Sequence, residues 1–455
     1  MKDHKKSSHW LIPVLMSAIV LAGCGRQSAP WPGTAAESET EEVSASHDDI
    51  REREPEEDQG QLPRRYDGRE HGRTALVRDQ GELGTCWAFA SVSALESHLL
   101  PEESWDFSED HMSHDPDFLL GQTGGGEYTM AMAYLLSGQG PVTEEQDPYG
   151  DGVSPEYAEP VKAVREIRIL PEKDLEAVKG AVLRWGGVQS SLYLEMRSKD
   201  SPSEFYRPDT YAYCCLQETA PNHDIVIVGW DDDFPKESFS SEVSENGAFI
   251  CENSWGTGFG EEGFFYVSYE DCNLGKNNVV YSDVCDPGWY DRLYQSDRCG
   301  WIGQLGYGGE SAWAANVYTA QADEQMIAAG FYATDQNTEY EIYIVHDVPE
   351  DPADMAFAAR RRYAGGTLQH AGFYTISFAE TAALAAGERF AVMIHLTTPG
   401  VIHPIAIEYD AGDGKCRVDL EDGEGYISAE GARWERVEDN QNCNLCLKAY
   451  TVCGE

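Results

Sequence analysis

The clearest repeat of apolar residues follows position 86. Four apolar side chains recur every three or four residues, the spacing that places them on one face of an α-helix. Small residues between them allow close packing on the remaining faces, so we expect a buried helix over 87–100. A second helix is predicted over 171–185, where the apolar residues again share one face. The repeating residues of the first helix are Phe89, Val92, Leu95 and Leu99.

Downstream of the second predicted helix, the pattern changes to that of β-strands. Short runs rich in β-branched and aromatic residues are bounded by glycine or polar residues, which is typical of strands. Helices followed by strands predict an α+β domain built in two halves. The predicted strands cover residues 188–194, 224–230, 247–252 and 263–269.

From Trp289 onward, short aromatic and glycine-rich runs alternate with turn residues. This pattern predicts an all-β sandwich or jelly roll over 289–452. Trp301 and Trp313 lie in this region, where they serve either as core residues, which we favour, or as a platform for a sugar ring. The predicted strands include residues 326–333, 340–346, 372–378 and 389–396.

The first 61 residues differ in composition from the rest of the chain. A lysine-containing start precedes an apolar run from Trp10 to Ala22, which is typical of a secretory signal. The residues up to Cys24 resemble the bacterial lipobox, so residues 1–24 are predicted to be a lipoprotein signal peptide with Cys24 lipidated. An ordinary signal cleaved nearby is the alternative. Residues 25–61 are predicted to be an acidic, disordered linker.

Acidic residues dominate the chain, with 80 Asp and Glu against 33 Lys and Arg and a net charge of -47. Such a charge repels nucleic acids and anionic lipid head groups. We therefore exclude nucleic-acid binding and expect membrane association only through an N-terminal lipid anchor. Of 12 cysteines, an odd number remains if Cys24 is lipidated, so at least one thiol stays unpaired.

Cys86 stands where a glycine-containing loop enters the first predicted helix. Free amide groups and the dipole of a helix N-terminus stabilise a thiolate and lower the pKa of the thiol. The backbone N–H of Cys86 and the side-chain amide of Gln80 can donate hydrogen bonds to a developing oxyanion. Cys86 is therefore the candidate nucleophile.

His223 and Asn253 supply the other groups that such a nucleophile needs. His223 lies at the start of a predicted strand and can carry the proton of the thiol. The side chain of Asn253 can accept a hydrogen bond from the imidazole without adding charge, and Trp255 can shield that bond from water. The side chain of Asp224 is expected to point away from the His223 face and to have only a modest effect.

These segments resemble, in their order, the active-site motifs of the papain-like cysteine peptidases. The resemblance covers roughly residues 62–285 and implies a two-lobed domain with a helical lobe and a β-barrel-like lobe. It implies that Gly125 and Gly126 pair with the substrate backbone, and we expect Trp255 to bind substrate with them. The implied roles are Cys86 as nucleophile, His223 as general base and acid, Asn253 as orienting residue and Gln80 in the oxyanion hole.

Two further features qualify the resemblance. Leu83 occupies the position of a family cysteine, and the segment 107–112 lacks the partner cysteine, so both halves of one disulfide are missing together. Residues 289–452 resemble the lectin-like β domain that follows such peptidases in certain anaerobic bacteria. The resemblance implies a glycan ligand, although no residue pattern in this region indicates sugar binding.

The sequence thus predicts a secreted cysteine peptidase, acting as an endopeptidase, that is lipid-anchored on the outer face of a bacterial membrane. A surface adhesin or carbohydrate-binding protein with a vestigial peptidase domain, and a cysteine transpeptidase, remain the alternatives. No cofactor or metal is expected, because no ligand set completes the spacing of His111 and His114. For Cys443 and Cys446, disulfide bonds are favoured over zinc.

Overall fold

The computed structural model describes residues 52–53, 62–155, 157–196, 198–350, 352 and 354–454. The predicted signal peptide and Cys24 lie outside the described residues. Within the predicted linker, Glu52–Arg53 form a short strand, β1, which pairs in parallel with β16 (Arg361–Leu368). These two residues therefore adopt a strand where the composition predicted disorder. In the described part of the chain, no helix is both long and apolar enough to span a membrane.

The first predicted helix is confirmed as α1 (Cys86–Leu99), and it is buried along nearly its whole length. Its small residues permit this, because Ala88, Ala90 and Ala94 let neighbouring elements approach closely. Helix α1 packs against strands β7 (His223–Asp231) and β10 (Asn278–Cys285) and against helices α2 (Glu109–Ser113) and α4 (Tyr128–Leu136). The helical half also contains α3 (Gly121–Gly124). Strand β2 (Arg65–Asp67) pairs with β7 of the β half, and η1 (Gly68–His71) follows it.

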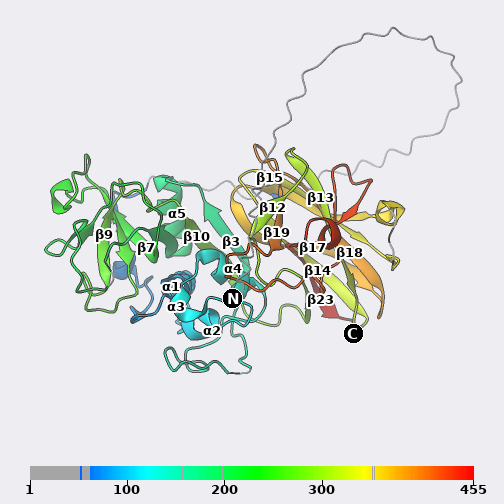
Figure 1. Ribbon diagram of the computed structural model, residues 1–455, viewed down its shortest axis with the longest axis horizontal. Helices are drawn as coiled ribbons and strands as arrows, with labels where there is room; N and C mark the ends of the chain where they lie inside the picture. The colour runs from blue at the N-terminus through cyan, green and yellow to red at the C-terminus, as the bar shows by residue number, and fades with distance from the viewer. Residues whose placement is uncertain are drawn as a thin grey trace, which may run out of the picture. The chain divides into compact units, whose positions relative to one another are not determined.

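All four strands predicted for the β half are present, as β4, β7, β8 and β9, and they lie on the left of Figure 1. Helix α5 begins at Leu175 rather than at position 171, because the side chain of Asp174 caps it by accepting a hydrogen bond from Ala177 N at 3.0 Å. The bounds are β3 (Ala163–Leu170), α5 (Leu175–Trp185), β4 (Val188–Leu192), β5 (Tyr206–Arg207), β6 (Ala212–Tyr213), β7 (His223–Asp231), η2 (Lys236–Ser238), β8 (Ala248–Glu252), β9 (Phe264–Ser268) and β10 (Asn278–Cys285).

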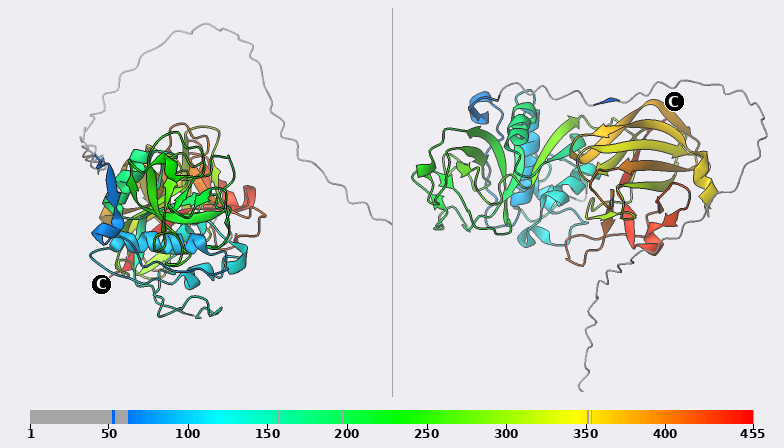
Figure 2. Two further views of the ribbon diagram at one scale, coloured as in Figure 1. Left: turned by 90° about the vertical axis from the view of Figure 1, so that its left-hand side faces the viewer. Right: turned by 90° about the horizontal axis from the view of Figure 1, so that it is seen from above.

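The region after residue 289 is a β sandwich, as predicted (Figure 2). One sheet has the order β1-β16-β15-β18-β13-β20-β21, and its apolar face shares a core with β14, β17 and β23. Trp313 is buried in a neighbouring cluster, in agreement with the core interpretation. The bounds are β11 (Arg292–Tyr294), β12 (Gly303–Leu305), β13 (Ser311–Thr319), β14 (Glu324–Ala333), β15 (Thr338–Val345), η3 (Asp354–Ala359), β17 (Ala371–Leu384), β18 (Arg389–Thr397), β19 (Ile405–Tyr409), β20 (Gly425–Ser428), β21 (Glu435–Arg436), α6 (Val437–Asn440), β22 (Cys443–Leu445) and β23 (Leu447–Cys453).

The two regions share one sheet. Strand β17 of the sandwich pairs antiparallel with β3, which pairs in turn with β10, and the order continues through β4, β7 and β8 (Figure 1). Gly372 permits this junction, because a Cβ atom there would lie 2.0 Å from the carbonyl oxygen of Ile167. The junction was not predicted, since the sequence indicated two separate domains.

Candidate active site

Strand pairing places His223 beside Asn253. Strands β7 and β8 are antiparallel neighbours, so the first residue of β7 lies near the residue that follows β8. His223 Nε2 and Asn253 Oδ1 are 2.8 Å apart, and both side chains are buried. The ring of Trp255 lies 5.2 Å from the His223 ring, between centroids, and limits access of water. Because Nε2 is engaged with Asn253, Nδ1 is the ring nitrogen left for the nucleophile.

Cys86 begins α1 and is a partly exposed, unbonded thiol. The backbone N–H groups of Asp224, Trp87 and Cys86 lower the pKa of its thiol and so favour the thiolate. The influence of the Asp224 backbone indicates that the sulfur lies near the first residues of β7. The predicted nucleophile and base are thus brought to one place by the packing of α1 on β7.

The loop before Cys86 is tied to the turn after β8. Gln80 N donates to Ser254 O at 2.8 Å, and Ser254 Oγ donates to Gln80 Oε1 at 2.5 Å. Gln80 Nε2 donates one hydrogen to Leu83 O at 2.7 Å, which leaves its second N–H for another acceptor. The hydroxyl of Tyr149 lies 2.9 Å from Gln80 O and 2.6 Å from Thr85 Oγ1, so it braces both ends of the loop.

The two glycines predicted to bind substrate lie against the same loop. Gly125 follows α3 and has a φ of 85°. The backbone nitrogen of Gly125 lies so near Gly84 that a Cβ atom on Gly84 would be 2.9 Å from it. A Cβ on Gly126 would overlap the indole of Trp87, at 2.3 Å from its Nε1. This segment can therefore pass close to the nucleophile only as glycine.

Burial opposes a negative charge on Cys86 and a positive charge on His223 when each charge is considered alone. It raises the pKa of the Cys86 thiol to about 12, and the carboxylate of Asp224 adds to the effect. Burial also lowers the pKa of His223 to about 4, against the opposing effect of the hydrogen bond with Asn253. The expected lowering of the thiol pKa is therefore wrong: backbone N–H groups at the helix N-terminus do lower it, but desolvation outweighs them.

Asp224 has a larger influence than the sequence suggested. Its carboxyl group accepts hydrogen bonds from Ser191 Oγ at 2.6 Å and from Gln189 Nε2 at 3.1 Å. Gln189 Oε1 in turn accepts a hydrogen bond from Ser91 Oγ at 2.9 Å. Sequence reasoning did not single out Gln189 and Ser191, although polar residues inside the fully buried strand β4 were a usable signal.

A group of buried carboxyls lies behind the site, around the guanidinium of Arg78. Arg78 forms two hydrogen bonds with Glu96, at 2.8 and 3.1 Å, and an ion pair with Glu109 at 3.4 Å. Glu252, directly before Asn253, accepts a hydrogen bond from Ser93 Oγ at 2.8 Å. Burial raises the pKa of Glu109 to about 8 and that of Glu252 to about 7.

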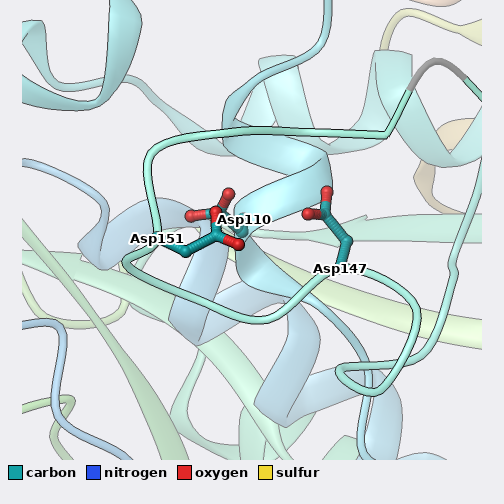
Figure 3. Close-up of side chains that lie close together, drawn as sticks. All are labelled: Asp110, Asp147 and Asp151. Carbon is teal, nitrogen blue, oxygen red and sulfur yellow. The ribbon is translucent and has the colours of Figure 1, made fainter.

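A second acidic group, Asp110, Asp147 and Asp151, has ligand atoms within 4.8 Å of one another (Figure 3). Hydrogen-bond donors reach all three carboxyl groups, including His114 Nδ1 at 2.9 Å from Asp110 Oδ2. These carboxylates could hold a cation, but their hydrogen bonds account for their positions, and we assign them no role. His111 is hydrogen-bonded to the hydroxyl of Tyr134 at 2.7 Å.

One disulfide is formed within the described residues, between Cys299 and Cys416. Cys443 and Cys446 are buried, unbonded thiols, so the favoured disulfide interpretation is wrong for this pair. Their apolar surroundings in the sandwich explain why they remain as small core residues.

Known proteins resemble both regions of the chain. Residues 62–282 match the papain family of cysteine proteases, and residues 293–451 match the lectin like domain. Cathepsin K of Gallus gallus is 30% identical over 217 residues, which are 45% of this chain and 59% of that protein. A cysteine protease of Blomia tropicalis is 26% identical over 237 residues, which are 49% of this chain and 66% of that protein. The chain therefore spans less than two thirds of the length of these curated relatives.

Solved structures match over more of the chain. The clostridial cysteine protease Cwp84 after propeptide cleavage has a TM-score of 0.76 at 25% identity, covering 86% of this chain and 99% of that one. The cysteine protease and lectin-like domains of Cwp84, a surface layer associated protein of Clostridium difficile, have a TM-score of 0.74 at 25% identity, covering 87% and 90%. Residues 62–282 are therefore a papain-family cysteine protease domain, and residues 293–451 are a lectin-like domain that follows it as in Cwp84.

Proposed function

We propose that this chain hydrolyses peptide bonds through an acyl-enzyme formed on Cys86. The observation that carries the proposal is the 2.8 Å hydrogen bond between His223 Nε2 and Asn253 Oδ1. It fixes the ring and leaves Nδ1 for the thiol, which lies where β7 begins. An orienting acceptor, an imidazole and a cysteine at a helix N-terminus are the groups that thiol-dependent acyl transfer requires.

In the first step, Cys86 transfers its proton to His223, and the thiolate adds to the carbonyl carbon of the substrate. Burial disfavours each charge alone, but a single proton transfer creates both charges together. The attraction between the thiolate and the imidazolium then offsets part of the cost of desolvating them. The tetrahedral oxyanion accepts hydrogen bonds from the backbone N–H of Cys86 and the second N–H of the Gln80 amide.

In the second step, His223 gives its proton to the leaving amine, and the C–N bond breaks to leave a thioester on Cys86. His223 then removes a proton from water, which attacks the thioester and releases the acid. Gly125 and Gly126 hold the substrate backbone against the loop, and Trp255 covers the His223–Asn253 hydrogen bond. No cofactor takes part in these steps.

A position at the bacterial cell surface is part of the proposal. It is supported by the lipobox-like residues before Cys24 and by the likeness to Cwp84, which is surface-layer associated. A lipid on Cys24 would anchor the chain to the outer face of the membrane. Incorporation of a fatty-acid analogue that is lost in Cys24→Ala would support the anchor, and incorporation that persists would exclude it. The lectin-like domain is proposed to bind a glycan.

The test is covalent labelling of the purified chain with an epoxide that alkylates activated thiols, followed by mass spectrometry. We expect one adduct, on Cys86, that is absent in Cys86→Ala. Asn253→Ala should slow labelling by about 10²-fold, because the imidazole loses its fixed orientation. Cys251, a buried thiol on the neighbouring strand, is the internal control and should stay unmodified.

Three results would redirect the proposal. Absence of any adduct on the folded chain, or equal modification of several cysteines, would overturn the peptidase assignment. Glycan binding together with absence of proteolysis would favour the adhesin. Transfer of the acyl group to an added amine in preference to water would favour the transpeptidase.

A further inference from the structure

Asp224 is a buried carboxyl group that has no cationic partner. Its side chain is 8% exposed, and its two hydrogen-bond donors, Ser191 and Gln189, are both neutral. Within the described part of the chain, no Lys, Arg or His forms an ion pair with it. A buried carboxylate of this kind is costly unless an opposite charge reaches it, so its position calls for an explanation.

This carboxyl group lies next to the reacting atoms. The backbone N–H of Asp224 favours the thiolate of Cys86, and the Asp224 carboxylate is the largest electrostatic influence on that thiol after burial itself. The carboxyl group therefore lies within electrostatic range of the proposed nucleophile, beside which the substrate residues around the scissile bond must lie. Burial raises the pKa of Asp224 to about 6, so the group is ionised at pH 7.5.

The surroundings of Asp224 add negative charge. Ser191, which bonds to Asp224 Oδ1, also lines an open pocket of about 350 Å³. Two acidic residues, Glu172 and Glu218, and one basic residue, Lys276, line this pocket. Glu127, which directly follows Gly126, also acts on Asp224 through its charge. The region can therefore offer a basic side chain more than one carboxylate.

We propose that Asp224 is a specificity-determining residue that pairs with a lysine or arginine side chain of the substrate close to the scissile bond. The proposal rests on the peptidase activity proposed above. An incoming ammonium or guanidinium group supplies the missing opposite charge and displaces no existing cation. Ser191 and Gln189 hold the carboxyl group in place, so little reorganisation accompanies binding.

The experiment compares peptides that carry either lysine or norleucine at one of the three positions before the cleaved bond. Norleucine retains the aliphatic stem of lysine and lacks its charge. At pH 7.5, we expect the lysine peptide to have at least a 10-fold higher kcat/KM at one position. Asp224→Asn should reduce this ratio about 10-fold. The readout is the ratio and not either rate alone, because loss of the carboxylate also changes the electrostatics of Cys86 and acts on both peptides equally.

Two further variants separate the pairing from general effects of charge and folding. Glu218→Lys changes an exposed residue of the pocket, and it should lower the ratio even if Asp224→Asn does not fold. Asp209→Asn removes an exposed carboxylate between β5 and β6 and should leave the ratio unchanged. An equal loss in Asp209→Asn would attribute the preference to the net charge of the chain and overturn the proposal.

The norleucine peptide distinguishes the two proposals from each other. If the parent cleaves it but prefers lysine at none of the three positions, or if a folded Asp224→Asn keeps the parent's ratio, Asp224 does not select basic side chains. If the parent cleaves neither peptide and Cys86 does not react with the epoxide, the peptidase assignment fails, and the role of Asp224 fails with it.

Discussion

At the scale of single residues, buried acidic side chains outnumber basic ones behind the proposed catalytic residues. Glu96, Glu109 and Glu252 are buried, and Arg78 is the cation that pairs with the first two. Glu252 has one hydrogen-bond donor, Ser93, and its Oε2 has no partner within the described residues. Protonation relieves this excess of negative charge, and burial accordingly raises the pKa of Glu252 to about 7.

Replacement of Glu252 by glutamine should therefore change how stability depends on pH. A carboxyl group with a raised pKa in the folded state stabilises the fold below its unfolded pKa, near 4.5, and loses that contribution as the pH rises toward 7. Glu252→Gln stays neutral at all pH values and keeps an acceptor for Ser93. We expect a similar Tm at pH 5 and a Tm about 5 °C higher than the parent at pH 8.

Differential scanning calorimetry from pH 5 to pH 8 measures this effect. Glu237→Gln, at an exposed position of η2, is the matched control and should follow the parent. Parallel pH profiles for the parent and Glu252→Gln would show that the buried carboxyl group does not bind the extra proton.

At the scale of elements, the position of one glycine determines how closely two strands can pair. Gly372 is the second residue in the pairing of β17 with β3 and has a φ of 137°. A Cβ atom on it would lie 2.0 Å from the carbonyl oxygen of Ile167. A side chain there must move one strand away from the other. Strand β17 would then lose hydrogen bonds to β3, the strand that links it to β10, β4 and β7.

Gly372→Ala should destabilise the chain through this clash. We expect a loss of about 2–4 kcal/mol in the free energy of unfolding, measured by urea denaturation, because overpacking adds to an unfavourable backbone conformation. Gly387→Ala is the matched control, since Gly387 also has a positive φ, 79°, but nothing lies within 4 Å of its Cβ position. Gly387→Ala should lower the free energy of unfolding by about 1 kcal/mol. Equal losses for the two variants would show that backbone conformation alone accounts for the effect.

The elements also show where sequence reasoning succeeded and where it failed. Helix α1 was predicted because its apolar residues repeat, and the positions of Cys86, Gln80, His223 and Asn253 followed from local motifs. Helix α4 was missed because its residues are apolar on every side and give no amphipathic pattern. The pairing of β3 with β17 joins residues about 200 positions apart, and no local pattern encodes such a contact.

At the scale of the whole molecule, the two regions share a hydrophobic core as well as a sheet. Tyr332, Phe373 and Cys446 of the lectin-like region lie in the same buried cluster as residues of α1, α4 and β3. Polar contacts join the regions too, because Arg298 Nε lies 2.6 Å from Asp117 Oδ2 and Lys415 Nζ lies 2.9 Å from Glu127 Oε1. Glu127 follows the glycines proposed to bind substrate, so the lectin-like region supports the edge of the proposed active site.

A fragment that ends at residue 288 should therefore be far less stable than the whole chain. Removal of the lectin-like region would expose the edge of β3 and the apolar residues that it covers, such as Ile167 and Ala133. The whole chain should unfold in one cooperative transition by calorimetry, and fragment 62–288 should aggregate or unfold at least about 10 °C lower. The Asp117–Arg298 contact offers a milder disruption: Arg298→Ala should lower the Tm of the whole chain without splitting its transition.

Two separate transitions in the whole chain, the first matching that of the fragment, would show that the regions fold independently despite their common sheet. A single transition would instead mean that any event that loosens the lectin-like region also loosens the segment that carries Gly125 and Gly126.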